Sequence, residues 1–436
     1  MTFSMKNIFG FLFYGLLSLS VAAQETVYPA PAYNGLLFIK NAVVHVGDGQ
    51  VLDGVTIMIK GGKIEKIAKD LPIPMDDVKV FDVKGKHVYP GLILSSSVLG
   101  LVEVNAVRAT ADFNELGEFN PSIRSIVAYN SDSKVINTLR SNGILLAGVT
   151  PQGGLISGSS SVVQLDAWNW EDAGYKPDNG IHLNMPDLIN RPNPFGDASN
   201  PPGDPLKRGM EQVDKMKAFF REAKAYAFEP AHASTNLKYE AVKGLFNKSQ
   251  KLFVHADAVR EMLVAVDFSK EFGMDVVIVG GSESFQIAPL LKANNIAVIL
   301  SQMHSLPTAT DDDVDQPYKT PAMLQQAGVL FAINDEDGQT RGRNLAFNAG
   351  TAAAYGLTKE QALQAITLNA ARILGIADRT GSLEPGKDAN FVVSEGDILD
   401  MRSSVITQAF IQGRLIDLTD KHKQLNERYK HKYSLK

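Results

Sequence analysis

The sequence predicts an α/β fold: a (β/α)8 TIM-like barrel with a small β-sandwich-like domain built from both chain ends. Short β-rich segments occupy residues 35–90 and return at 381–420. Between them, over residues 91–375, short apolar runs alternate with amphipathic stretches of helical length. The repeat of about 25 residues is that of successive β/α units, and this many units favour a closed barrel over an open doubly wound sheet.

Length and composition agree with such an architecture and exclude several classes of protein. The 436 residues are enough for one large domain and a smaller one. The absence of cysteine excludes a disulfide scaffold, a thiolate zinc site, an iron–sulfur protein and a cysteine nucleophile. Lys and Arg number 43 against 48 Asp and Glu, so no basic excess points to a nucleic-acid partner. Any metal must therefore bind histidine, carboxylate or carbonyl ligands.

Residues 1–23 predict a secretory signal peptide. Lys6 precedes an apolar run over residues 8–23, and the run ends in the small residues Val21, Ala22 and Ala23. The alternative is a retained membrane anchor, although the run is short for a spanning helix. We therefore expect an exported protein, periplasmic or extracellular, with no membrane association after cleavage.

The β-rich ends and the tail form the second unit. Gly61-Gly62 and Gly85 punctuate the strands of residues 35–90 as hairpin turns do. The strands of residues 381–420 complete this domain, and residues 421–436 form a basic tail.

The expected barrel strands are continuous apolar runs, as in sheets buried on both faces. They are Gly143–Val149, Lys251–His255, Asp275–Val279, Ala297–Leu300 and Val329–Ile333. Helices are expected at Val259–Phe272, Phe285–Asn294 and Pro321–Ala327. A capping box from Thr358 to Gln361 opens one further packing helix that stops at Gly375. Residues 153–205, rich in Gly, Pro, Asn and Asp, indicate long loops on the face that carries the site.

Three stretches together resemble the amidohydrolase superfamily, in its imidazolonepropionase-like and prolidase-like branch. They are FIKNAVVHVGDGQVLDGVTIMIKGGKIEKIA leading to HVYPGLI, then VHADAVREM, and last GLTKEQALQAITLNAARILGIADRTGSLEPGKDANFVV. The resemblance implies a barrel with a β domain, and a metal-assisted hydrolase active at the barrel mouth.

The chain departs from that family at the metal ligands which the resemblance implies. Ser96 and Val98 stand where the first strand carries His-x-His, and Gly280 stands at the histidine of strand six. Valine and glycine side chains cannot ligate a metal, and a neutral serine hydroxyl is a poor zinc ligand. These are degenerate ligand positions.

Two family positions retain functional residue types. His255 ends a barrel strand at the position of the strand-five ligand, and Asp335 matches the general-base aspartate, with Glu336 and Asp337 adjacent. The alternative for Asp335 is a polar loop with an Asx turn. His304 is either a replacement ligand or a solvated loop residue. His182 and His232, in loop-like sequence, have weaker claims.

Other polar segments are candidates for binding. Gly153, Gly154 and Ser157 lie in a glycine- and serine-rich turn whose N–H groups suit an anion or carboxylate. Trp168 follows it and either lines a substrate pocket or anchors a loop. Acids after the first strand either hold a hard cation or form a charged surface loop; they are Glu103, Asp112, Glu115 and Glu118.

The leading hypothesis is an exported amidohydrolase-like hydrolase that acts on a C–N bond in an amide, cyclic amide or short peptide-like substrate. Its metal site is degenerate, with either one divalent metal such as zinc or none. The alternatives are a pseudoenzyme barrel that binds a ligand or an active homologue, and a purely structural exported protein. The partner is a small-molecule substrate or ligand, and the choice between homo- and hetero-oligomer stays open.

Overall fold

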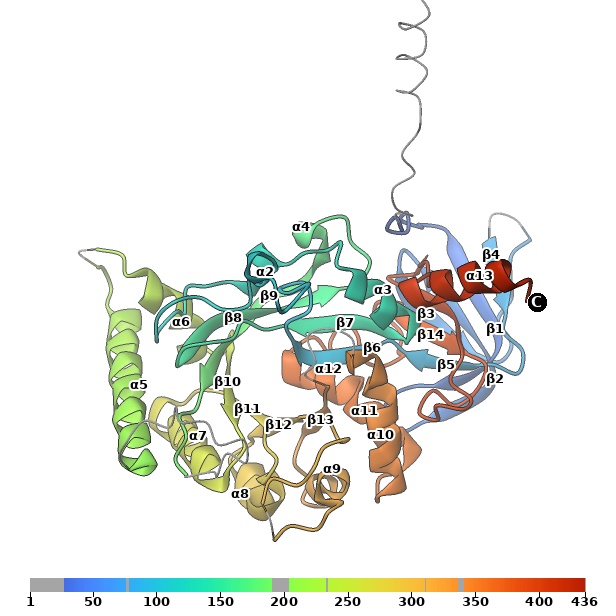
Figure 1. Cartoon of the computed structure of the whole chain (residues 1–436). Helices are drawn as coiled ribbons and strands as arrows, with labels where there is room; N and C mark the ends of the chain where they lie inside the picture. Colours follow the sequence, from blue (N-terminus) through green and yellow to red (C-terminus); the bar gives the residue numbers. More distant parts are fainter. Residues whose placement is uncertain are drawn as a thin grey trace, which may run out of the picture.

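The structure of the chain is a computed structural model that describes residues 27–75, 78–189, 204–232, 234–309, 311–335 and 341–435 (Figure 1). The expected signal peptide at 1–23 and the acids Glu336 and Asp337 lie outside these ranges. Within them, no helix combines the length and the apolarity needed to span a bilayer.

Two eight-stranded sheets make up the fold, and the smaller unit takes strands from both chain ends. Its order is β16-β15-β14-β5-β1-β2-β3, with β4 paired to β1. The bounds are β1 Leu36–His45, β2 Val51–Lys60, β3 Lys63–Ala68, β4 Val78–Asp82, β5 His87–Pro90, β14 Phe391–Ser394, β15 Ile406–Ile411 and β16 Arg414–Leu415. This confirms the β domain of the predicted fold class.

The two predicted turns of this domain differ in outcome. Gly61 and Gly62 have φ of 55° and 78° and join β2 to β3, the hairpin geometry that favours glycine. The Gly85 turn was expected to make a hairpin and does not, because β4 and β5 both run parallel to β1.

The barrel sheet follows the order β13-β12-β11-β10-β9-β8-β7-β6. Its strands are β6 Leu92–Ser97, β7 Ile144–Val149, β8 Ile156–Gln164, β9 Gly174–Asn184, β10 Lys251–Ala256, β11 Val276–Gly280, β12 Ala297–Leu300 and β13 Phe331–Ile333. The strands predicted within residues 143–333 are therefore confirmed. Their side chains form one continuous apolar core with the helices.

The barrel departs from regular β/α alternation at β8, which runs antiparallel to both β7 and β9. Residues 153–205 were expected to be long loops, and this was wrong for the strands β8 and β9. Their serine, glycine and proline residues are typical of loops. Most residues of β8 and β9 are nevertheless buried, because these strands pair with each other and with β7 and β10.

Side-chain hydrogen bonds join the two ends of the barrel sheet. Asn334, directly after β13, accepts the N–H groups of Ser95 and Ser96 through its Oδ1, at 2.9 and 3.2 Å. Its Nδ2 donates to the carbonyl of Ser96 at 2.8 Å. One buried amide thus takes the place of a ladder between β13 and β6.

Helices surround this sheet (Figure 1). They are α2 Ser125–Ala128, α3 Lys134–Ser141, α4 Trp170–Ala173, α5 Pro205–Phe228, α6 Leu237–Phe246, α7 Val259–Phe272, α8 Ala288–Ala293, α9 Gln316–Gln326, α10 Leu345–Ala354, α11 Lys359–Ala365, α12 Leu368–Leu374 and α13 Lys421–Tyr433, with 3₁₀ turns η1 Arg108–Thr110, η2 Ser284–Ile287 and η3 Arg341–Asn344.

The expected helix Phe285–Asn294 divides into the 3₁₀ turn η2 and the helix α8, and three further segments differ in detail from the predictions. The helix α9 begins at Gln316, because Pro317 occupies its first turn and Pro321 lies inside it rather than at its start. The expected single helix after Thr358 divides into α11 and α12 at Thr367, whose φ and ψ are −133° and −92°. The basic tail at 421–436 contains the helix α13, which contacts α3.

Candidate active site

Adjacent strands bring two histidines together near the carboxyl ends of β9 and β10. In the parallel register, His182 stands opposite Phe253 and His255 opposite Asn184. The Nδ1 atom of His182 lies 2.8 Å from Nε2 of His255, so one ring donates to the other. The ring of Phe253 stacks on His182 at a centroid distance of 4.8 Å. His182, which had only a weak claim from sequence, is therefore the direct partner of His255.

Burial keeps this pair neutral near pH 7. It lowers the pKa of His182 well below 6.5, and the neighbouring His255 lowers it further. Burial also lowers the pKa of His255 to about 4, with Asp257 opposing the shift. His182 is 2% exposed, and its Nε2 atom has no hydrogen-bond partner among the described residues.

A polar row extends from the histidines toward a cavity. His182 and Asn184 share one face of β9, since strand side chains alternate, and Asn184 Nδ2 donates to Ser157 Oγ at 2.9 Å. Ser157 lines a cavity of about 440 Å³ together with Pro151, Phe113, Ile123 and Arg124. The predicted binding residue Ser157 therefore lies on a strand, beside a cavity and near the histidine pair.

Gly153 and Gly154 have a structural explanation of their own. Their φ angles are 85° and 64°, and a Cβ at Gly154 would lie 2.6 Å from the carbonyl oxygen of Gly117. A Cβ at Gly153 would lie 3.1 Å from Cβ of Asn114. These glycines allow the chain after β7 to pack against residues 114–118.

Asp335 is the second residue after β13 and is 2% exposed. Asn348 on α10 donates to its Oδ2 at 3.2 Å. The same amide accepts the N–H groups of Met303 and His304 at 2.7 and 3.2 Å. Asn348 thus connects the carboxylate to the segment that follows β12. In the sequence, Asn348 could have been recognised as the single amide side chain in the mostly apolar helix LAFNAGTAAA.

His304 belongs to a different environment. Its side chain is exposed, and its Nε2 lies 2.8 Å from Oγ1 of Thr351 on α10. Within the described residues, no hydrogen bond or ring contact links it to His182 or His255.

The degenerate ligand positions have structural roles. Ser96 Oγ pairs with Thr150 Oγ1 at 3.2 Å, and Val98 is buried at 8% exposure. Gly280 has a φ of 102°, and a Cβ there would lie 2.9 Å from Oδ1 of Asp257.

The residues present do not fit the divalent metal that the resemblance implies. Within the described ranges, no three His, Asp or Glu side chains converge on a metal-sized position. The candidate nitrogen of His255 already pairs with His182. The acids after the first strand disperse: Glu103 accepts from Asn130, and Glu118 lies 3.9 Å from Lys215. No chemical step is therefore assigned to a metal.

The expected binding residue Trp168 lies elsewhere. It lines a second cavity, of about 700 Å³, together with residues of the β domain. Because β8 is antiparallel to its neighbours, its end at Gln164 lies at the opposite end of the barrel from the histidine pair. Trp168 therefore does not line the cavity beside Ser157.

Comparisons with known proteins match this fold and this family resemblance. A family model described as "Amidohydrolase family" matches residues 213–416. The crystal structure of an amidohydrolase from Thermotoga maritima MSB8 has a TM-score of 0.76 and 25% identity, over 87% of this chain and 99% of that one. A prolidase complexed with N-methylphosphonate-L-proline has a TM-score of 0.53 and 18% identity, over 88% of this chain and 99% of that one.

One curated relative also matches over most of the sequence. The amidohydrolase tasK of Hapsidospora irregularis is 20% identical over 431 residues, which is 88% of this chain. The chain spans 43% of the length of that relative. Together these matches confirm the resemblance drawn from the sequence.

Proposed function

We propose that this chain, a member of the amidohydrolase superfamily, is an exported hydrolase that acts on a C–N bond in an amide, cyclic amide or short peptide-like substrate. The observation that carries the proposal is the neutral pair of His182 and His255. It stands at the carboxyl ends of barrel strands, where enzymes of this architecture hold their catalytic groups.

The pair suits the polarisation of a carbonyl group. When His182 Nδ1–H donates to His255 Nε2, the proton of His255 resides on Nδ1 and is available to a substrate oxygen. Burial holds this imidazole neutral, and a neutral imidazole can donate to a developing oxyanion.

Asp335 supplies the base in the proposed reaction. It takes a proton from water as the water oxygen bonds to the carbonyl carbon, and it returns that proton to the nitrogen as the C–N bond breaks. One carboxylic acid and one amine leave, so atoms and charge balance. Asn348 holds the carboxylate in place through its Nδ2.

The cavity beside Ser157 suits one end of such a substrate. Its wall combines apolar side chains of Phe113, Ile123 and Pro151 with Arg124. Asp178 accepts a hydrogen bond from Arg124 Nε at 2.9 Å, and this bond raises the pKa of the guanidinium. Most of the cation's charge is thus compensated, and an apolar substrate group is the better fit.

Hydrolysis assays on N-acyl amino acids, dipeptides and a cyclic amide test the proposal. With any substrate that turns over, Asp335→Asn should lower kcat by about 10²- to 10⁴-fold, and His255→Gln should do so as well. His304→Gln is the matched control and should leave kcat unchanged. Full activity in Asp335→Asn would show that the base assignment is wrong.

A second candidate is a pseudoenzyme barrel that binds a ligand or an active homologue. This candidate is favoured because Ser96, Val98 and Gly280 stand at three positions where the family carries metal-binding histidines. Absence of turnover across the panel, together with saturable binding of a substrate analogue, would select this candidate. Metal analysis of protein purified without chelator completes the comparison. A full equivalent of tightly bound zinc would show that the residues present do form a metal site.

Export is part of the proposal and rests on Lys6 and the apolar run over residues 8–23. Mass spectrometry of the protein recovered from an exporting bacterial host should give an N-terminus near Gln24. An intact Met1 in the cytoplasmic fraction would contradict export.

A further inference from the structure

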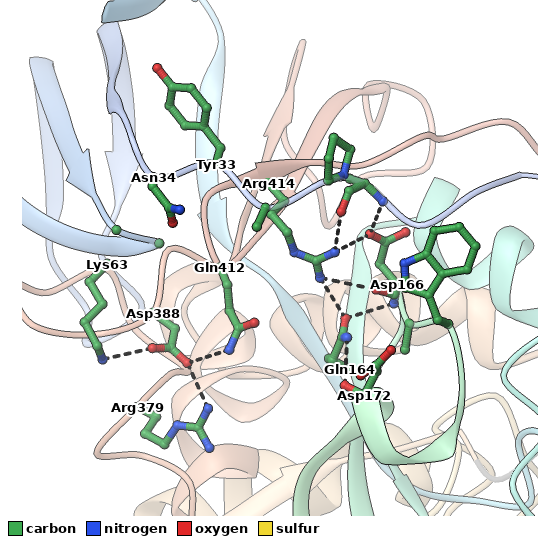
Figure 2. A pocket seen from close by; sticks show the side chains of 17 residues that line it. Tyr33, Asn34, Lys63, Gln164, Asp166, Asp172, Arg379, Asp388, Gln412 and Arg414 are labelled. Carbon is green, nitrogen blue, oxygen red and sulfur yellow. Dashed lines mark hydrogen bonds and ion pairs between the residues drawn. The ribbon is translucent and has the colours of Figure 1, made fainter.

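The cavity of about 700 Å³ lies where the barrel and the β domain meet. Its wall includes Lys63 from β3, Gln164 at the end of β8, Arg379 before β14 and Arg414 on β16. Figure 2 shows two polar clusters on its opposite sides, one around Asp388 and one around Asp166. Neither cluster takes part in the chemistry proposed for the histidine pair.

The two buried carboxylates in this wall are already neutralised. Asp388 accepts from Lys63 at 3.0 Å, from Arg379 at 3.2 Å and from the hydroxyl of Tyr175 at 2.7 Å. Asp166 pairs with both Arg140 and Arg414. Each carboxylate thus faces two cations, which leaves an excess of positive charge in the wall.

Spare hydrogen-bond donors remain on the side of Asp388. Lys63 is 52% exposed, and its ammonium makes two bonds, to Asp388 and to the carbonyl of Gly386, so one N–H is free. Arg379 is 40% exposed and uses one N–H on each terminal nitrogen, to Tyr175 and Asp388. Its guanidinium lies over the ring of Tyr175, with Cζ 3.9 Å from the ring centroid. The Nε–H and two further N–H groups are free. A carboxylate ligand suits these donors.

The other side of the cavity offers a negative charge and an aromatic surface. The carboxylate of Asp172 makes no hydrogen bond or ion pair within the described residues. Trp168, which lines the same cavity, is 64% exposed. A free carboxylate and an indole face both attract an ammonium group.

We propose that this cavity binds a small zwitterion, a short peptide with free ends, whose two charges are far enough apart to reach both sides. Its carboxylate pairs with Lys63 and Arg379, and its ammonium group lies at Asp172 and Trp168. The volume falls within the range of small-molecule sites, about 300–1,000 Å³. The site is independent of the proposed hydrolase function, because it shares no residue with it.

Calorimetric titration of the full chain with L-phenylalanine and with phenylalanyl-alanine tests the proposal. The dipeptide should bind, L-phenylalanine, whose two charges share one carbon, should bind more weakly, and N-acetyl-phenylalanine amide, which lacks both charges, should not bind. Asp172→Asn should weaken binding by about 2- to 5-fold, since it removes one charge of a solvent-exposed pair. Asp70→Asn, at an exposed acid outside the cavity, is the matched control and should bind like the parent chain.

A second variant addresses the carboxylate side. Arg379→Gln should weaken binding, and Arg379→Lys should restore part of it while keeping the charge beside Asp388. Urea unfolding of each variant checks that the fold is intact. Absence of zwitterion binding to the parent chain, or unchanged binding to both Asp172→Asn and Arg379→Gln, would overturn the proposal. Binding lost in Asp335→Asn but retained in Asp172→Asn would also overturn it, because the ligand would then occupy the candidate active site.

Discussion

His182 and His255 share a single hydrogen bond, from Nδ1 of one ring to Nε2 of the other, at 2.8 Å. The bond needs one nitrogen to donate and the other to accept. If the accepting nitrogen were protonated, it could no longer accept the hydrogen bond, and its ring would carry a positive charge in a buried site. The folded pair is therefore stable only while the acceptor stays unprotonated.

This relationship predicts that stability falls with acid. The pKa of His255 is lowered from 6.5 to about 4 by burial, so below pH 6.5 the unfolded chain binds more protons than the folded one. The contribution is fully present above pH 6.5 and is lost as the pH falls toward 4. Between pH 8 and pH 5, this one residue should remove about 2 kcal/mol from the free energy of unfolding.

Urea unfolding at a series of pH values measures that loss. His182→Gln combined with His255→Gln should flatten the pH dependence between pH 6.5 and 5. His304→Gln, which changes an exposed histidine, should retain it. An unchanged slope in the double variant would show that other groups cause the acid sensitivity.

Asn334 predicts a second stability effect, at the junction of β13 and β6. Asn334→Leu removes three hydrogen bonds and leaves the buried N–H groups of Ser95 and Ser96 without their acceptor. The cost should be about 3 kcal/mol or more in the free energy of unfolding. Asn426→Ala, on the exposed surface of α13, should change it by less than about 0.5 kcal/mol. Equal effects would argue that this side chain does not join the barrel ends.

The buried cluster of Asp166 and the more exposed pair of Asp178 should differ in how much stability they lose when the aspartate becomes asparagine. The side chain of Asp166 is fully buried between Arg140 and Arg414, and burial lowers the pKa of Arg140. Asp166→Asn leaves two buried cations poorly compensated and should cost about 3–5 kcal/mol. Asp178→Asn, at the exposed pair with Arg124, should cost less than about 1 kcal/mol. Thermal or urea unfolding of both variants makes the comparison.

The sequence predicted the parts of the fold that rest on local pattern. Apolar runs such as Lys251–His255 became strands because both of their faces are buried. The hairpin of β8 and β9 escaped prediction, since ISGSSSVVQ and GYKPDNGIHLN carry the residues of turns. β8 pairs with β7 and β9, and β9 also pairs with β10, so these residues are buried by strand pairing that their composition does not indicate.

The site was predicted where a single strand or a family position defines it. His255 and Asp335 both lie at the ends of barrel strands, as expected. His182 was assigned to a loop, so its register opposite Phe253 was not visible. Asn348 lies on a helix after Asp335 and meets it only through tertiary packing.

Gly180 gives a last prediction, because it allows the packing that supports His182. A Cβ at Gly180 would lie 2.3 Å from Cε2 of Phe253, the ring that stacks on His182. Gly180→Ala should therefore displace Phe253, cost about 1–3 kcal/mol of stability and disturb the histidine pair. Gly174→Ala, at the start of the same strand, meets its nearest neighbour at 3.3 Å and has an ordinary φ of −61°, so it is the matched control. Proton NMR of the imidazole N–H groups reports the pair directly. An unperturbed hydrogen-bonded signal in Gly180→Ala would show that Phe253 does not hold His182 in place.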